Sequence, residues 1–186
     1  MFARSTTVRG NPLSMDDAIA YVRDEVMPAV QQMDGCIGLS MLCDRDTGRC
    51  IATTAWETEE AMHDSESGVH DLRMRMAEMM GGRPEIQEWE IAVMHRMREA
   101  PEGACARVTW ARGDPALIDD RMSTMRTAML PRVEELPGFC SVAKAARLAR
   151  SSRWMTAGPP LSPSRTWGRS CQRVARTSSG ISDGRR

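Results

Sequence analysis

The stretch that decides the fold is ARSTTVRGNPLSMDDAIAYVRDEVMPAVQQMDGCIGL, residues 3–39. It recurs without a gap 103 residues later as ARVTWARGDPALIDDRMSTMRTAMLPRVEELPGFCSV, residues 106–142. The identical positions run through the whole stretch and include Arg4, Gly10, Pro28 and Gly35, which return as Arg107, Gly113, Pro131 and Gly138. Self-similarity at a fixed spacing is the signature of a structural duplication. The chain is therefore predicted to hold one complete unit and the beginning of a second.

The complete unit is predicted to span residues 1–96 in the order strand, helix, strand, strand, helix, strand. Turn residues separate the runs, and the first helix begins at Ser14, where a hydroxyl can cap it. Pro28 inside that helix predicts a bend, and Gly68 predicts a split in the second helix, which begins near Thr58. The strands are expected at Phe2–Arg9, Cys36–Cys43, Cys50–Glu57 and Glu85–His95. This order predicts an α+β fold, a ferredoxin-like βαββαβ unit with one antiparallel sheet and two helices on one face.

The buried face of the first helix is also duplicated. Its apolar residues recur at steps of three and four, as expected for one side of a helix. They are Met15, Ile19, Val22, Val26, Val30 and Met33, and their counterparts are Ile118, Met122, Met125, Met129, Val133 and Leu136. A shared buried face indicates that both copies build the same structure.

The repeat stops near Val142. Residues 97–103 are predicted to be a linker, residues 104–142 an incomplete second βαβ copy, and residues 143–186 a disordered Arg/Ser/Pro-rich tail. A shift of the coding frame near Val142 is the favoured explanation for the tail; a linker to a lost partner and a basic tail that binds nucleic acid or membrane are the alternatives. Without its third strand, the second copy is expected to be mobile or to pair with the sheet of the first unit.

Charge and composition limit the classes of function that are expected for the chain. Up to Ala143 there are 15 Arg against 24 Asp and Glu, a net charge of −9, whereas the remainder carries 10 Lys and Arg against one Asp, a net charge of +9. The sequence contains no apolar run long enough to predict a membrane span or a secretory signal. A cytoplasmic protein without nucleic-acid or membrane partners is therefore expected. The six cysteines lack zinc-ligand spacing and are expected to be free thiols. Cys43 and Cys50 flank the turn of the predicted hairpin, where a disulfide is the alternative.

The first unit resembles the antibiotic biosynthesis monooxygenase family. The resemblance lies in MPAVQQMDG (residues 27–35), its copy LPRVEELPG (residues 130–138) and AWETEEA (residues 55–61). It implies the dimeric α+β barrel fold, in which two four-stranded sheets pack face to face, from two chains or from tandem repeats. It also implies a homodimer through the sheet face, since the second copy is incomplete.

The resemblance implies a cofactor-independent monooxygenase that acts on an aromatic or quinol-like small molecule. A non-catalytic small-molecule-binding or stress-associated protein, including a degenerate duplicate, is the alternative. The haem-degrading branch of the family places an Asn on the first strand, where this chain has Ser5, Thr6 and Thr7, so haem degradation is not expected.

Five residues are candidates for the site. His63 and His70 are candidate catalytic bases, because a histidine titrates near neutral pH and these two lie seven residues apart on one helix. Trp56, Arg4 and Thr6 are candidate substrate-binding residues, although a core Trp and an ion-paired Arg are common structural roles. No third ligand accompanies the histidines, so neither a metal nor another cofactor is predicted.

Overall fold

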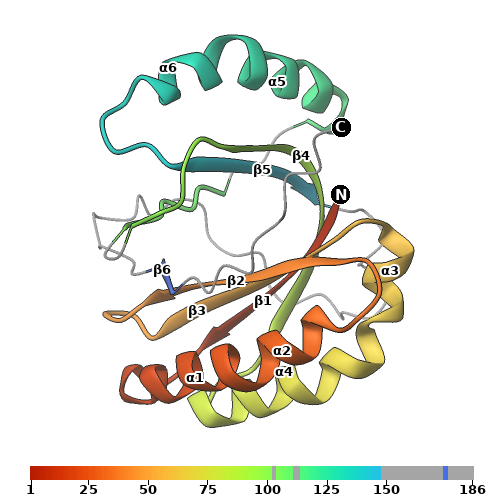
Figure 1. The fold of residues 1–186 in the computed structure, drawn as a ribbon, viewed down its shortest axis with the longest axis vertical. Coiled ribbons are helices and arrows are strands. Elements are labelled where there is room, and N and C mark those ends of the chain that lie inside the picture. The colour runs from red at the N-terminus through yellow and green to blue at the C-terminus, as the bar shows by residue number, and fades with distance from the viewer. Residues whose placement is uncertain (102–103, 111–113, 148–173, 176–186) are drawn as a thin grey trace.

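Figure 1 shows the chain as a computed structural model that describes residues 1–101, 104–110, 114–147 and 174–175. The first unit contains the strands β1 (Phe2–Arg9), β2 (Cys36–Asp44), β3 (Arg49–Trp56) and β4 (Glu85–Arg96). Its helical segments are η1 (Pro12–Ser14), α1 (Met15–Tyr21), η2 (Val22–Val26), α2 (Met27–Gln31), α3 (Glu59–Asp64) and α4 (Glu66–Met80). Beyond it lie η3 (Pro115–Leu117), α5 (Ile118–Thr124), η4 (Met125–Met129), α6 (Leu130–Glu134), β5 (Ser141–Arg147) and β6 (Val174–Ala175).

The strands form one antiparallel sheet in the order β5-β4-β1-β3-β2-β6. β1 lies between β3 and β4, and β2 pairs with β3, so the predicted α+β βαββαβ unit is confirmed. Figure 1 shows α1, α2 and α4 together on one side of this sheet. Their apolar stripes meet the inward residues of β1, β2 and β3 in a core that includes Val8, Met15, Val30, Met41 and Trp56.

The second helical segment divides at Ser65, whereas the sequence placed the division at Gly68. α3 ends at Asp64 and α4 begins at Glu66. The Ser65 hydroxyl donates to the Met62 carbonyl oxygen at 2.7 Å and accepts a bond from the Arg4 guanidinium at 3.2 Å. A side chain that binds its own backbone competes with the helix, which explains a break here rather than at the more flexible glycine.

The helical elements of the second part match those of the first at an offset of 103 residues. η3, α5, η4 and α6 begin and end 103 positions after η1, α1, η2 and α2, including the π-helical turn that precedes Pro28 and Pro131. A proline has no N–H to donate within the helix, and the π-helical turn accommodates this missing hydrogen bond. Both copies therefore accommodate the irregularity predicted at the proline in the same way.

The strands of the second part depart from the prediction. The predicted βαβ order begins with a strand, but residues 104–110 contain only an isolated bridge at Cys105, and residues 111–113 lie outside the described residues. β5 pairs antiparallel with β4 of the first unit, from Trp89↔Arg147 to Arg96↔Ser141. The expectation that this part borrows the first sheet is thus confirmed. β5 also extends five residues beyond Val142, and the rest of the predicted tail lies outside the described residues except for β6.

The duplicated helical stripe is more exposed in the second copy, where Met125 is nevertheless buried. Met15 and Val30 are fully buried, whereas Met129 and Leu136 of the second copy are 51% and 57% exposed. Figure 1 shows α5 and α6 on the opposite side of the molecule from α1 and α4. Because no counterpart of α4 covers them in the described residues, the same pattern leaves apolar surface exposed.

Within the described part of the chain, no helix combines the length and the apolarity that crossing a membrane requires.

We expect Gly10→Ala to destabilise the first unit. The ends of β1 and α4 and the β2–β3 turn interlock here, since Gly10 donates to the Gly48 carbonyl oxygen and Asn11 to that of Met80. An added Cβ at Gly10 would lie 2.0 Å from the Met80 carbonyl oxygen, which belongs to the backbone and cannot move aside cheaply. Urea unfolding followed by circular dichroism should show a loss of about 2 kcal/mol or more.

Gly68→Ala is the matched control for that substitution. Its added Cβ would meet only the flexible end of Met33, and alanine is the better helix former, so the free energy of unfolding should stay within about 1 kcal/mol of the wild-type value. Equal losses in both variants would contradict the interlocking of these chain segments.

Candidate functional site

β1 directs one buried cation at the helices. Arg4 shares a strand face with Thr6 and with Val8, and Val8 belongs to the core beneath α1 and α4. Arg4 is 4% exposed, and the register places it between Thr54 of β3 and Glu88 of β4. A buried guanidinium must be neutralised by nearby carboxylates, and the strand pairing brings the first of these alongside it.

The guanidinium of Arg4 is held by two carboxylates and a hydroxyl. Its Nε and Nη2 donate to Glu88 Oε1 at 3.2 and 3.0 Å, and its Nη1 lies 3.0 Å from Glu66 Oε2 and donates to Ser65. Arg73, itself buried, donates to both oxygens of Glu66 at 2.8 and 2.9 Å. The two cations and two anions form a closed network that joins β1, β4 and the start of α4.

The network changes the acidity of Glu66. The hydrogen bonds from Arg73 and the positive charges of Arg4 and Arg73 hold the pKa of Glu66 below its ordinary value of 4.5. Glu66 is also the first residue of α4, where a negative charge complements the helix dipole. The carboxylate is therefore the stable form of this side chain in the folded protein.

The two candidate histidines lie at the outer edge of this network. His63 Nε2 is 3.4 Å from Glu88 Oε2, and His70 Nδ1 is 3.9 Å from Glu66 Oε1. Their side chains are 49% and 58% exposed, and the break at Ser65 places them on different helices. They share the two carboxylates of the network rather than a common cavity.

Trp56 and Thr6 are both buried. Trp56 is fully buried in the core, and its indole N–H donates to the Thr54 hydroxyl at 3.0 Å. Thr6 is 8% exposed on the same face of β1 as Arg4. Trp56 thus has the role of a core anchor at the end of β3, where its one polar atom finds a partner.

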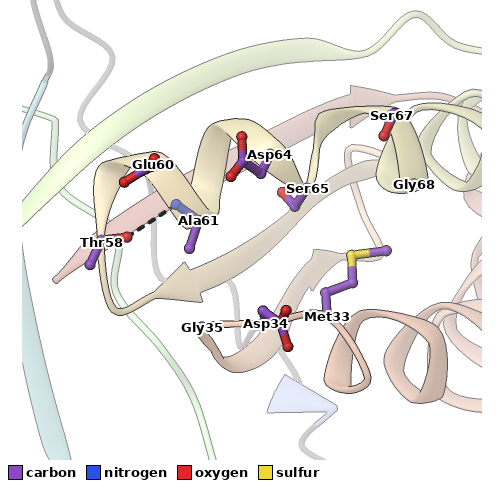
Figure 2. A pocket seen from close by; sticks show the side chains of 10 residues that line it. All are labelled: Met33, Asp34, Gly35, Thr58, Glu60, Ala61, Asp64, Ser65, Ser67 and Gly68. Carbon is purple, nitrogen blue, oxygen red and sulfur yellow. Dashed lines mark hydrogen bonds between the residues drawn. The ribbon is translucent and has the colours of Figure 1, made fainter.

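Figure 2 shows a pocket between the α2–β2 turn and the α3–α4 segment. Its volume is about 500 Å³. The lining residues come from two segments far apart in the sequence: Met33, Asp34 and Gly35 on one side, and Thr58, Glu60, Ala61, Asp64, Ser65, Ser67 and Gly68 on the other. Ser65 is the inner wall and touches Arg4, whereas Asp34, Glu60 and Asp64 are exposed carboxylates. None of the five residues predicted from sequence lines this pocket.

The sequence reasoning missed the acidic partners and the pocket. Glu88 faces Arg4 across an antiparallel pair, and a charge match between the first and fourth strands would have been the signal for it. Glu66 and Arg73 are seven residues apart, which is two helical turns, so they share a face of α4. The pocket depends on the break at Ser65 and left no sequence signal.

No group of three or more potential metal ligands comes together within the part of the chain that the structure describes. Four described cysteines are free, and Cys105 takes part in a disulfide, which departs from the expected free thiol.

Curated proteins from Mycobacterium tuberculosis are similar to the chain. The chain is 52% identical over 141 residues to the uncharacterized protein Rv2557 and 50% identical over 141 residues to the uncharacterized protein Rv2558. The match covers 76% of this chain, and the chain spans 63% and 60% of the lengths of these two relatives. No family model matches the sequence.

Two solved structures resemble the chain over most of its length. A protein described as a putative monooxygenase from Lactobacillus acidophilus matches 79% of this chain with a TM-score of 0.56 at 9% identity, and 70% of its own length is covered. Another from Fusobacterium nucleatum matches 78% of this chain with a TM-score of 0.56 at 10% identity, with 69% of its length covered. The chain shares their fold. The α+β fold implied by the monooxygenase resemblance is therefore confirmed, and at this identity the likeness concerns fold alone.

We expect Arg4→Met to lower the free energy of unfolding by about 3 kcal/mol, because it leaves Glu88 without its buried partner and Glu66 with Arg73 alone. Chemical unfolding at neutral pH measures this. Arg107→Met is the matched control, since the repeat counterpart of Arg4 is exposed and its loss should cost about 0.5 kcal/mol or less. Similar costs for the two variants would contradict a structural role for the network.

The Glu66 pair should make stability depend on acid pH. Because the folded pKa of Glu66 is depressed, its contribution is fully present above its ordinary pKa of 4.5 and is lost as the pH falls through the lowered value. Glu66→Gln should therefore be less stable than wild type at pH 7, and the difference should shrink towards pH 3. Glu57→Gln, an exposed carboxylate outside the network, is the control. A difference between Glu66→Gln and wild type that stays constant over this range would refute the assignment.

Proposed function

We propose that the protein binds a small molecule in the pocket between the α2–β2 turn and the α3–α4 segment. The observation that carries this proposal is the pocket itself. Its volume of about 500 Å³ is in the range of small-molecule sites, and it combines Met33 and Ala61 with the hydroxyls of Thr58, Ser65 and Ser67. Polar and charged residues make up six of the ten lining residues, so the pocket is more polar than the usual site of this size.

The charge of the pocket selects its ligand. Asp34, Glu60 and Asp64 supply three carboxylates at its rim, and the lining residues within the described part of the chain include no cation. Arg4 lies behind Ser65, but its donors are engaged by Glu88, Glu66 and Ser65. The ligand class is a neutral or cationic molecule with hydrogen-bond donors, such as an amine or a polyhydroxylated ring, because carboxylates accept hydrogen bonds and repel anions.

The second candidate is cofactor-independent oxygenation of an aromatic or quinol-like molecule. The fold shared with two proteins described as putative monooxygenases favours it. Such a reaction needs a substrate anion that the pocket stabilises, and three carboxylates act against that anion. The contacts of Trp56, His63 and His70 with the core or with the ion network also favour binding over catalysis.

The proposal also includes a homodimer that forms through the sheet, but only through part of the sheet face. Ala3, Ser5 and Thr7 occupy the face of β1 opposite the helices, and all three are 5% exposed or less within the single chain. A partner sheet would have to contact other strands, because this part of the face is already covered.

We expect small amines and polyhydroxylated aromatics to raise the melting temperature of the full chain, and anions of similar size to leave it unchanged. Ala61→Leu, which fills the pocket, should abolish the shift, whereas His63→Ala on the exposed side of the same helix should keep it. Shifts that survive Ala61→Leu would place binding elsewhere.

Oxygen uptake separates the two candidates. Dissolved O₂ is followed with an electrode while the purified protein is incubated with each hydroquinone or phenol that shifts the melting temperature. Binding without O₂ uptake above the protein-free rate supports the binding function. Protein-dependent uptake that Ala61→Leu removes would support the oxygenase instead.

A further inference from the structure

Two buried thiols face each other at the end of the β2–β3 hairpin. The strand register pairs Cys43 of β2 directly with Cys50 of β3, and the next pair, Asp44↔Arg49, closes onto the turn. The side chains are 3% and 0% exposed and belong to the core cluster beneath the helices. Both are free cysteines.

The distance between the two sulfur atoms is the decisive observation. Cys43 Sγ lies 2.9 Å from Cys50 Sγ. A disulfide bond is about 2.05 Å long, so the sulfurs have less than about 1 Å to travel. Free cysteines are common in cores simply as small apolar side chains, but packing does not require two of them to point at each other from opposed strand positions.

We propose that Cys43 and Cys50 form a reversible cross-strand disulfide, which makes the hairpin a thiol-oxidation site. This inference does not depend on the proposed ligand pocket, because neither cysteine lines it.

The chemistry needs a two-electron oxidant, and hydrogen peroxide is small enough to reach a buried pair. One of the two thiols loses its proton, and the resulting thiolate attacks one peroxide oxygen. The O–O bond breaks and leaves a cysteine sulfenic acid and a hydroxide, which takes up that proton to form water. The sulfur of the other cysteine then attacks the sulfenic sulfur, loses its proton and expels hydroxide, so the second product is also water. The two thiols lose two electrons and two protons in total, and two equivalents of an external thiol reverse the step.

The local environment disfavours the reactive form of the pair. The hydrogen bond with Cys43 and the burial of the side chain raise the pKa of the Cys50 thiol. Because the thiolate is the reactive form, oxidation should be slow in the closed hairpin.

The test is peptide mapping of the full-length protein after treatment with hydrogen peroxide, with free thiols blocked before digestion. Trypsin cleaves after Arg23, Arg45, Arg49 and Arg73, so the disulfide would join residues 24–45 to residues 50–73. We expect this linked pair to appear with peroxide, to lose its link on reduction, and to be accompanied by a rise in melting temperature of a few degrees.

Cys36 lies on the same tryptic peptide as Cys43, so single variants assign the link. Cys36→Ser should retain the linked pair and the thermal shift, and both Cys43→Ser and Cys43→Ala should lose them. Retention of the link in the Cys43 variants would overturn the proposal. Oxidation of Cys140 without the linked pair would also overturn the proposal, because oxidised Cys140 shows that the oxidant acted on the protein.

Discussion

The buried guanidinium of Arg4 is the constraint around which the first unit is organised. A cation that is 4% exposed cannot remain in a core without compensation, and three separate elements supply it. β4 brings Glu88, α4 begins with Glu66, and the chain between α3 and α4 leaves the helix at Ser65 to offer a hydroxyl. The order of strands, the start of one helix and the end of another are thus coupled through one side chain. The pocket inherits this coupling, because Ser65 forms its inner wall.

The local sequence pattern was sufficient to predict the helices, the strands and the strand order of the first unit. Alternating strands, capped helices and a repeated apolar stripe predicted the βαββαβ arrangement, since each rests on contacts close in the sequence or on a pattern repeated along it. The candidate site was harder to predict. Arg4 was a candidate substrate-binding residue, with an ion-paired role as the alternative. Its partners Glu66 and Glu88 lie on other elements, and only the register between β1 and β4 brings one of them alongside. His63 and His70 were paired by a helical spacing that the break at Ser65 removes.

The second part shows that a pattern specifies an element but not its surroundings. Its helical elements begin and end at the positions equivalent to those of the first copy, and they include the π-helical turn before the proline. The apolar stripe that is buried in α1 and α2 is nevertheless about half exposed at Met129 of the second copy. Burial of such a stripe depends on a sheet and a second helix, which come from distant parts of the sequence. β5 pairs with β4 of the first unit, and this pairing satisfies backbone groups that would be costly to leave unpaired.

On the helix-facing side of the sheet, Arg4 is paired with Glu88 and Glu66, and Trp56 lies in a packed core. What remains open to solvent is a pocket at the edge of α3, rimmed by carboxylates. Such a rim suits a ligand that donates hydrogen bonds and disfavours one that must lose a proton before it reacts. The likeness in fold thus describes how the chain is built, and the charges around the pocket decide what it can hold.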